Sequence, residues 1–276
     1  MTFSIVARSA DGTSWGVAVA SKFLAAGSAV PAAVAGIGAI ATQALANVSY
    51  KAQALALLDE GATASVALQR LIDDDEGRDQ RQVGIVDLDG LAATYTGAAC
   101  LDWAGGETGE GVAIQGNILT GPEVVAAMRA SWDEGDPAAP LAERLLAALR
   151  AGDEAGGDRR GRESAALLVV TEGGGIGGFD DVQVDLRVDH HDDPVTELEK
   201  LLAIHGTYFP DVPLDERVPD TPELMAELDS RARSLGLPGL MEWMGQHNLE
   251  GYGGPDWTAR TVVDRLRAAT PEWRSG

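Results

Sequence analysis

Thr2-Phe3-Ser4-Ile5-Val6-Ala7-Arg8 is a run of strand-prone residues, and Trp15-Gly16-Val17-Ala18-Val19-Ala20 repeats the pattern after the turn Ser9-Ala10-Asp11-Gly12. Aromatic and β-branched residues in both runs favour strands, and Asp-Gly is a common hairpin turn. The pattern predicts a β-hairpin whose first strand starts at Thr2. That start would fix Thr2 at the edge of a sheet.

Strands and helices follow the hairpin in blocks. Further strands are predicted at residues 36–43, 83–86, 92–96, 112–119, 164–171 and 183–188, and helices at 49–58, 63–72, 121 onward, 141–150 and 195–205. Because the two kinds of element are grouped and do not alternate one by one, the order predicts an α+β fold of antiparallel sheets layered with helices. It argues against a doubly wound parallel sheet.

The chain changes character beyond residue 206. It contains Pro-rich loops and predicted helices at 222–235 and 258–268, with no clear strand. We therefore expect one domain over residues 1–205 and a small, mainly helical domain over residues 206–276.

The composition excludes several classes of protein. Of the 276 residues, 45% are hydrophobic, which is enough for a buried core and argues against global disorder. The 43 acidic and 21 basic residues give a net charge of -22, which repels nucleic acid and anionic membrane surfaces alike. The single cysteine, Cys100, excludes an internal disulfide and a cysteine-based zinc site.

No targeting or membrane-spanning segment is expected. Residues 23–50 carry no charge, but they contain Pro31, Gln43, Asn47 and several glycines and are mostly alanine, not leucine. We expect a cytoplasmic protein that has neither a nucleic acid nor a membrane as its partner.

Thr2 is the leading candidate for a catalytic residue. Removal of Met1 would place Thr2 at a free N-terminus, with its hydroxyl as the nucleophile. The α-amino group there has an ordinary pKa of about 7.7–8.0, close enough to neutral for it to act as the general base. Such a threonine supplies both nucleophile and base, so we expect no cofactor.

Four further residues are candidates for the same chemistry. Ser21 and Lys22 follow the second strand of the hairpin, where Lys22 would lower the pKa of the Thr2 hydroxyl or hold a substrate carboxylate. Gln43 and Asn117 follow apolar strands, where their amides would bind the oxyanion of an acyl-transfer intermediate. The alternatives are a solvated lysine, helix capping by Gln43 and an ordinary Gly-Asn turn at Asn117.

The candidates for substrate binding are Asn47, Asp158, Arg160 and Ser164. Asn47 follows the same strand as Gln43 and would supply an amide donor, or else cap the next helix. Arg160 would clamp a substrate carboxylate through two parallel hydrogen bonds. Asp158 and Ser164 lie just before and at the start of a predicted strand, and the alternative is a structural ion pair that holds this loop.

The stretch Asp189-His190-His191-Asp192-Asp193 resembles a metal cluster, but we expect no metal site there. Adjacent histidines of an extended strand point to opposite sides, so they do not easily chelate one ion. A metallohydrolase centred on these histidines is a third option, and it would carry a stoichiometric metal.

Six separated segments, found in order, carry a resemblance to a known family: residues 2–8, 16–23, 38–44, 115–119, 157–161 with 164–167, and 184–189. They resemble domain of unknown function 1028, a bacterial family assigned to the N-terminal nucleophile (Ntn) hydrolase superfamily, over residues 2–205. The resemblance implies a four-layer αββα sandwich. Residues 206–276 resemble a peptidoglycan-binding module that is often attached to this family. Proteasome-type threonine hydrolases need an aspartate at the end of the second strand, where this chain has Ala20.

The leading hypothesis is an Ntn-type amidohydrolase that uses Thr2 on a small amide or a short peptide-like substrate. The alternative is a non-catalytic binding module that keeps the sandwich as a scaffold and binds a glycan or a protein through its tail. In that alternative Trp243, Tyr252, Trp257 and Trp273 would stack on sugars, unless they form the core of the small domain. Sandwich sheets of this kind often associate, so we expect a homo-oligomer.

Overall fold

Strand β1 (Thr2–Arg8) forms the middle of a six-stranded antiparallel sheet in the computed structural model, which describes residues 2–210 and 212–274. The order across this sheet is β10 (Val182–Val188), β9 (Ser164–Thr171), β2 (Ser14–Ser21), β1, β8 (Val112–Asn117) and β7 (Gly105–Gly109). The predicted hairpin of β1 and β2 is confirmed, and its register pairs Phe3 with Ala20.

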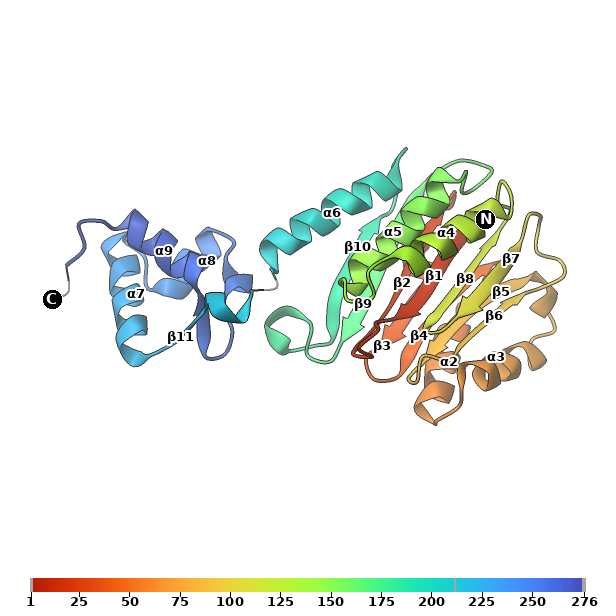
Figure 1. Ribbon diagram of the computed structural model, residues 1–276, viewed down its shortest axis with the longest axis horizontal. Helices are drawn as coiled ribbons and strands as arrows, with labels where there is room; N and C mark the ends of the chain where they lie inside the picture. Colours follow the sequence, from red (N-terminus) through yellow and green to blue (C-terminus); the bar gives the residue numbers. More distant parts are fainter. Residues whose placement is uncertain (1, 211, 275–276) are drawn as a thin grey trace. The chain divides into compact units, whose positions relative to one another are not determined.

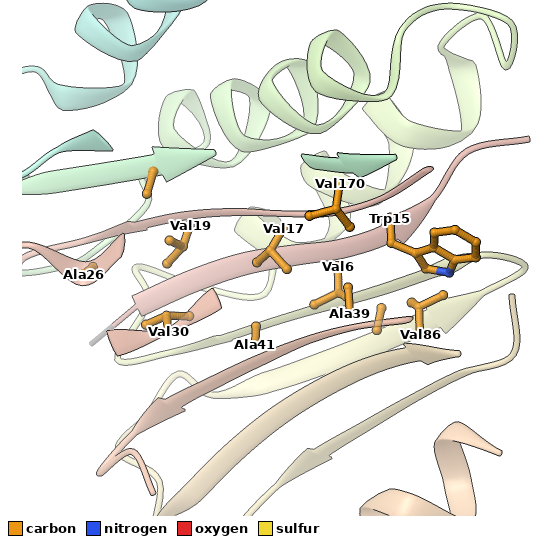
Figure 2. Packing of buried hydrophobic residues seen from close by; sticks show 12 residues of the cluster. Val6, Trp15, Val17, Val19, Ala26, Val30, Ala39, Ala41, Val86 and Val170 are labelled. Carbon is orange, nitrogen blue, oxygen red and sulfur yellow. The ribbon is translucent and has the colours of Figure 1, made fainter. Parts of the chain in front are cut away.

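A second antiparallel sheet packs against the first. Its order is β3 (Pro31–Val34), β4 (Gly38–Ala44), β5 (Arg81–Asp87) and β6 (Ala92–Thr96). Side chains of the two sheets meet in an apolar layer, where Val6, Trp15 and Val17 of the first sheet pack with Ala39 and Val86 of the second (Figure 2). Both faces of β1 are therefore covered, which explains why its sequence lacks the polar alternation of a strand that faces water.

Two pairs of helices cover the outer faces of the sheets (Figure 1). They are α2 (Tyr50–Asp59) and α3 (Ala64–Asp73) on the four-stranded sheet, and α4 (Glu123–Glu134) and α5 (Leu141–Glu154) on the six-stranded sheet. Gly16 of β2 allows α5 to approach closely, since a Cβ at this position would lie 2.7 Å from Leu145 Cδ1. The protein is the α+β, four-layer αββα sandwich that the sequence predicts, followed by a helical part.

The chain divides into two compact units, residues 1–200 and 201–276. The division falls inside helix α6 (Pro194–Tyr208), whose Val195 and Leu198 are fully buried. A short helix, α1 (Ala26–Ala29), connects the two sheets between β2 and β3. Across residues 2–210 and 212–274, no helix has the length and apolar character needed to cross a bilayer.

The second unit contains α7 (Pro222–Ser234), α8 (Leu240–Gln246) and α9 (Arg260–Ala269), with a shared apolar core. It also contains the antiparallel strands β11 (Arg217–Pro219) and β12 (Trp257–Ala259). The expectation that this part has no strand is therefore wrong. Strands of three residues are too short to leave an alternating pattern in the sequence.

Candidate functional site

Thr2 lies between the last residues of its two neighbouring strands, β2 and β8. Thr2 Oγ1 is 3.0 Å from Ser21 Oγ, and the two residues are only 6% and 2% exposed. Both side chains face the second sheet, because they alternate in step with Val6 and Val19 of the layer between the sheets. Ser21, and not Ala20, is therefore the residue of β2 whose side chain meets Thr2.

Two side-chain amides hold the backbone carbonyl of Thr2. Gln43 Nε2 donates to Thr2 O at 3.2 Å, and Asn117 Nδ2 donates to it at 3.4 Å. The same two amides both donate to Gln82 Oε1 at 2.8 Å. Gln43 comes from β4 and Asn117 from β8, so the contact joins the two sheets at Thr2.

Gln82 of β5 lies at the centre of this arrangement and is fully buried. Its amide nitrogen donates to the Gly116 carbonyl at 2.7 Å and to Thr96 Oγ1 at 2.9 Å. Since its oxygen accepts from Gln43 and Asn117, both ends of the Gln82 amide are satisfied. A buried amide with all its hydrogen bonds made rigidifies its surroundings, because its movement would leave several buried partners unsatisfied.

Ser4 and Gln115 extend the polar network along β1 and β8. Ser4 Oγ donates to Gln43 Oε1 at 2.7 Å and accepts from Gln115 Nε2 at 2.6 Å. Gly84 makes room for this amide, because a Cβ there would lie 2.1 Å from Gln115 Oε1. We refer to Thr2, Ser4, Ser21, Gln43, Gln82, Gln115 and Asn117 as the inter-sheet polar network.

The sequence prediction placed Gln43 and Asn117 at oxyanion-binding positions, and the structure brings both of them to Thr2. An amide has two N–H hydrogens, and those of Asn117 have acceptors in Thr2 O and Gln82 Oε1. The Gln43 amide is likewise directed at Thr2 O and Gln82 Oε1. In this state the two amides position Thr2, and their hydrogens point into the protein.

Sequence reasoning missed Gln82, Ser4 and Gln115 as members of the site. The available signal was a polar residue at a core-facing position of an otherwise apolar strand. Ser4 lies between Thr2 and Val6 on the face of β1 that meets the second sheet. Polar side chains at such positions are uncommon and need partners, so they point to a network.

Lys22 lies next to Ser21, but its side chain is directed elsewhere. Lys22 Nζ donates to Glu163 Oε2 at 2.7 Å and to the Arg162 carbonyl at 2.9 Å. Glu163 also pairs with His190 Nδ1, and the ammonium of Lys22, followed by His190, lowers the pKa of this carboxyl. Lys22 therefore faces an exposed charged cluster.

Asp158 shapes the loop beside the end of β2. Its carboxylate accepts the Lys22 backbone N–H at 2.6 Å and the Arg160 backbone N–H at 2.9 Å. The Arg160 guanidinium lies 3.4 Å from the same carboxylate, with 44% of the Arg160 side chain exposed. Asp158 is thus a structural acceptor next to Ser21, whereas the side chain of Arg160 is partly exposed to solvent.

Ser164 and Asn47 both hold backbone in place. Ser164 Oγ donates to the Phe23 carbonyl at 2.6 Å and accepts the Ala26 N–H at 3.0 Å, which fixes the start of α1. Asn47 Oδ1 accepts from the Ser49 N–H at 3.2 Å, immediately before α2. Neither side chain contacts Thr2 through any of these bonds.

The adjacent histidines have separate local partners. His190 Nδ1 pairs with Glu163, and His191 Nδ1 accepts the Asp193 N–H at 3.0 Å. Within the described part of the chain, no group of three or more His, Cys, Asp and Glu residues is arranged to hold a metal ion.

Two surface hollows occur on the side of the four-stranded sheet. One is lined by residues of the connection between α2 and α3 and of α3 itself, from Glu60 to Arg70, and the other by residues of α3, β6 and β7, including Leu68 and Tyr95. Thr2 lines neither of them. The inter-sheet polar network is the better candidate for a functional site, because it places a nucleophilic side chain within a built set of partners.

These features define the chain first as an αββα-sandwich protein with a buried hydroxyl pair at the end of its central strands. The chain belongs to the family of unknown function DUF1028, whose model matches residues 2–198.

A solved structure agrees with this assignment. A DUF1028 protein from Silicibacter pomeroyi is 32% identical in sequence, and its crystal structure matches 74% of this chain and 86% of that chain with a TM-score of 0.67. Anbu, an ancestral beta-subunit from Yersinia bercovieri, matches 76% of this chain and 98% of its own at 10% identity and a TM-score of 0.34, which is too distant to carry an argument. No curated protein matches the chain.

Proposed function

We propose that the protein is an Ntn-type amidohydrolase that hydrolyses a small amide or a short peptide-like substrate through Thr2. The observation that carries the proposal is the 3.0 Å contact between the Thr2 and Ser21 hydroxyls in a site where amides also hold the Thr2 carbonyl. The proposal requires that the peptide bond before Thr2 be cleaved, so that Thr2 has a free amino group.

The reaction proceeds in two acyl transfers. Thr2 Oγ1 attacks the carbonyl carbon of the amide, and its proton moves to the free α-amino group. The carbon–nitrogen bond then breaks, the leaving amine takes this proton, and the acyl group remains on Thr2 as an ester. Water attacks the ester with the amino group again as base, which releases a carboxylic acid and restores the Thr2 hydroxyl.

The neighbouring residues position Thr2 for these steps. Ser21 orients the hydroxyl, and Gln43 and Asn117 fix the carbonyl, so that the nucleophile and its own amino group keep one geometry. Arg160, with its partly exposed side chain, is the candidate for binding a carboxylate of the substrate. None of these steps calls for a cofactor.

The test is covalent labelling of Thr2 by a β-lactone. A chain whose first residue is Thr2 should gain one acyl group on Thr2, detected by intact mass and peptide mapping. A chain that retains Met1, and the variant Thr2→Ala, should gain none. Absence of label on the chain that starts at Thr2 would refute the proposal.

The Lys22→Met variant tests the role of the charge next to Ser21. If Lys22 lowers the pKa of the Thr2 hydroxyl or holds a substrate carboxylate, this variant should label more slowly than the parent. An unchanged labelling rate would remove Lys22 from the mechanism and leave it as a partner of Glu163.

The second candidate is a non-catalytic binding module that uses the C-terminal unit to bind a glycan or a protein. It is favoured by the amides of Gln43 and Asn117, whose hydrogens are directed at protein acceptors and not at a substrate. Within the C-terminal unit Trp243 is only 3% exposed, which fits a core role for that ring. A chain that no β-lactone labels but that binds a peptidoglycan fragment would support this candidate.

A further inference from the structure

Large apolar side chains are exposed on three separate connections at the end of the sandwich that contains Thr2. Phe23 and Leu24 are 59% and 61% exposed, Leu45 and Val48 are 61% and 55% exposed, and Leu101 is 63% exposed. Exposed aromatic and aliphatic side chains that gather at one place mark a binding surface more often than scattered ones do. We refer to these five residues as the apolar rim.

The first part of the apolar rim is attached directly to the hydroxyl pair. Phe23 and Leu24 follow Ser21 in the chain by two and three residues. Ser164 Oγ, which is fully buried, holds the Phe23 carbonyl at 2.6 Å. Phe23 and Leu24 are therefore exposed on a segment whose backbone is held in place.

The second part of the rim follows Gln43, which contacts the Thr2 carbonyl. The Leu45 N–H donates to the Gln80 carbonyl at 3.1 Å, and the Leu45 carbonyl accepts from Arg81 Nη1 at 2.6 Å. Val48 belongs to the same connection, between β4 and α2. The backbone here is also fixed while both apolar side chains face solvent.

The third part of the rim adjoins Asn117, the other residue that holds Thr2. The Ile118 N–H, next in the chain, donates to the Leu101 carbonyl at 2.8 Å. The rim residues thus follow Ser21 and Gln43 in the chain or bind the neighbour of Asn117, and each of these three residues contacts Thr2. The rim residues come from different connections around the buried Thr2 hydroxyl. This arrangement suits the binding of a substituent about as large as an amino-acid side chain.

We propose that the apolar rim binds an alkyl or aromatic group of the substrate next to the scissile amide, so that the enzyme prefers amides with an apolar substituent over charged ones of the same length. This inference rests on the proposed function. All five rim side chains are uncharged. Lys22 and Arg81 are paired with Glu163 and Asp75, and Lys51, three residues beyond Val48, donates to the Ser28 carbonyl at 3.2 Å. A charged substituent placed on these uncharged side chains would lose its hydration.

The experiment compares β-lactones that share one ring and differ in the tail. The tails are a hexyl chain and chains of equal length that end in a carboxylate or an ammonium, and the unsubstituted lactone serves as reference. We expect the hexyl compound to label Thr2 about tenfold faster than either charged compound. Leu45→Ser and Leu101→Ser should reduce this preference severalfold, measured as the labelling rate of the hexyl compound relative to that of the unsubstituted lactone.

Leu88→Ser is the matched control. Leu88 is 48% exposed and lies in the turn after β5, at the end of the strand away from Gln82. It should keep the full preference for the hexyl tail. Equal labelling by all three tails, or an equal loss of preference in Leu88→Ser, overturns the inference.

Two further outcomes separate this inference from others. If Leu45→Ser splits a homo-oligomer, measured by light scattering, and leaves the tail preference intact, the rim is an interface between copies and the inference is wrong. If the unsubstituted lactone does not label Thr2 in the parent chain, the proposed function itself fails, and this result is read before any tails are compared.

Discussion

Among single residues, Gln82 of β5 acts on the position of Thr2 through two amides that contact both residues. It accepts from Gln43 and Asn117 at 2.8 Å each, and these are the amides that hold the Thr2 carbonyl. A loss of the Gln82 oxygen would free both amides at once. The geometry of the candidate nucleophile therefore depends on a glutamine from the opposite sheet.

We predict that Gln82→Leu destabilises the protein by about 3 kcal/mol, because it leaves the buried amides of Gln43 and Asn117 and the Gly116 carbonyl short of a partner. Urea unfolding followed by fluorescence measures the change. Gln69→Leu is the control, since Gln69 lies on the exposed face of α3 and bonds only to Asp73 through its side chain; it should change stability by less than about 0.5 kcal/mol. Equal midpoints for the two variants would contradict the prediction.

The sequence was sufficient to nominate Thr2, Ser21, Gln43 and Asn117, and it was insufficient to say how they are used. Each is polar at the end of an apolar strand, which is a local feature. Gln82 is different. Gln43 is its cross-strand neighbour in the same sheet, but its partners Asn117 and Gly116 belong to β8, so these contacts depend on how the two sheets are stacked. No local sequence pattern indicates how the two sheets pack, so the role of Gln82 could not be predicted.

At the scale of secondary-structure elements, Asp87 ties the end of β5 to the start of α3. Asp87 Oδ2 accepts the Ala64 N–H at 2.8 Å, and Oδ1 accepts the Leu91 N–H at 2.8 Å within the turn to β6. Its backbone carbonyl accepts from Trp15 Nε1 at 3.1 Å. One buried carboxylate thus serves a helix N-terminus and a hairpin turn.

Asp87→Ala should destabilise the protein by about 2–3 kcal/mol, because the buried Ala64 N–H and the turn N–H groups lose their acceptor. Thermal unfolding by circular dichroism measures this effect. Asp89→Ala changes an exposed carboxylate of the same turn and should have little effect. A similar loss in both variants would mean that the turn needs charge and not the bonds of Asp87.

Elements with a strong apolar pattern were predictable, and elements that depend on a neighbour were not. The α3 helix starts after Thr63, whose hydroxyl accepts the Val66 N–H at 3.4 Å, as a capping residue before an apolar run implies. By contrast β7, with the sequence Gly-Gly-Glu-Thr-Gly, has no strand signal. This segment forms a strand because it pairs with the open edge of β8, and that edge is created by the sheet as a whole.

In the second unit, Glu227 of α7 joins α7 to α9. Its carboxylate accepts from Arg231 Nε at 2.7 Å and from Arg267 Nη2 at 2.9 Å, and Arg267 followed by Arg231 lowers the pKa of Glu227 to about 2. A carboxyl whose pKa is lower in the folded state contributes stability above its unfolded pKa of about 4.3, and this contribution is lost as the pH falls toward 2.

We therefore expect Glu227→Gln to destabilise the second unit by up to about 1 kcal/mol at pH 7, since part of the ion pair is screened by solvent. The difference from the parent should shrink between pH 5 and pH 2, as the parent carboxyl becomes protonated. Urea unfolding at several pH values measures it. Glu223→Gln, at an exposed position of the same helix, should show no such convergence; a difference that stays constant with pH in Glu227→Gln would contradict the assignment.

At the scale of the whole molecule, the first half of α6 belongs to the sandwich although the helix continues into the second unit. Val195 and Leu198 are fully buried, and Arg150 of α5 donates to Glu199 Oε1 at 2.8 Å and to Thr196 Oγ1 at 3.0 Å. All of these α6 residues precede the division between the units at residues 200 and 201, so they belong to the sandwich unit.

This placement predicts the outcome of shortening the chain. A chain that ends at residue 208 keeps all of α6, so its sandwich should unfold at the same urea concentration as in the full chain and Thr2 should be labelled at the same rate. A chain that ends at residue 193 loses the buried Val195 and Leu198, which should lower stability by about 3–5 kcal/mol. Equal stability of the two shortened chains would mean that α6 is not part of the sandwich, and a slower labelling of Thr2 in the longer one would mean that the second unit takes part in the site.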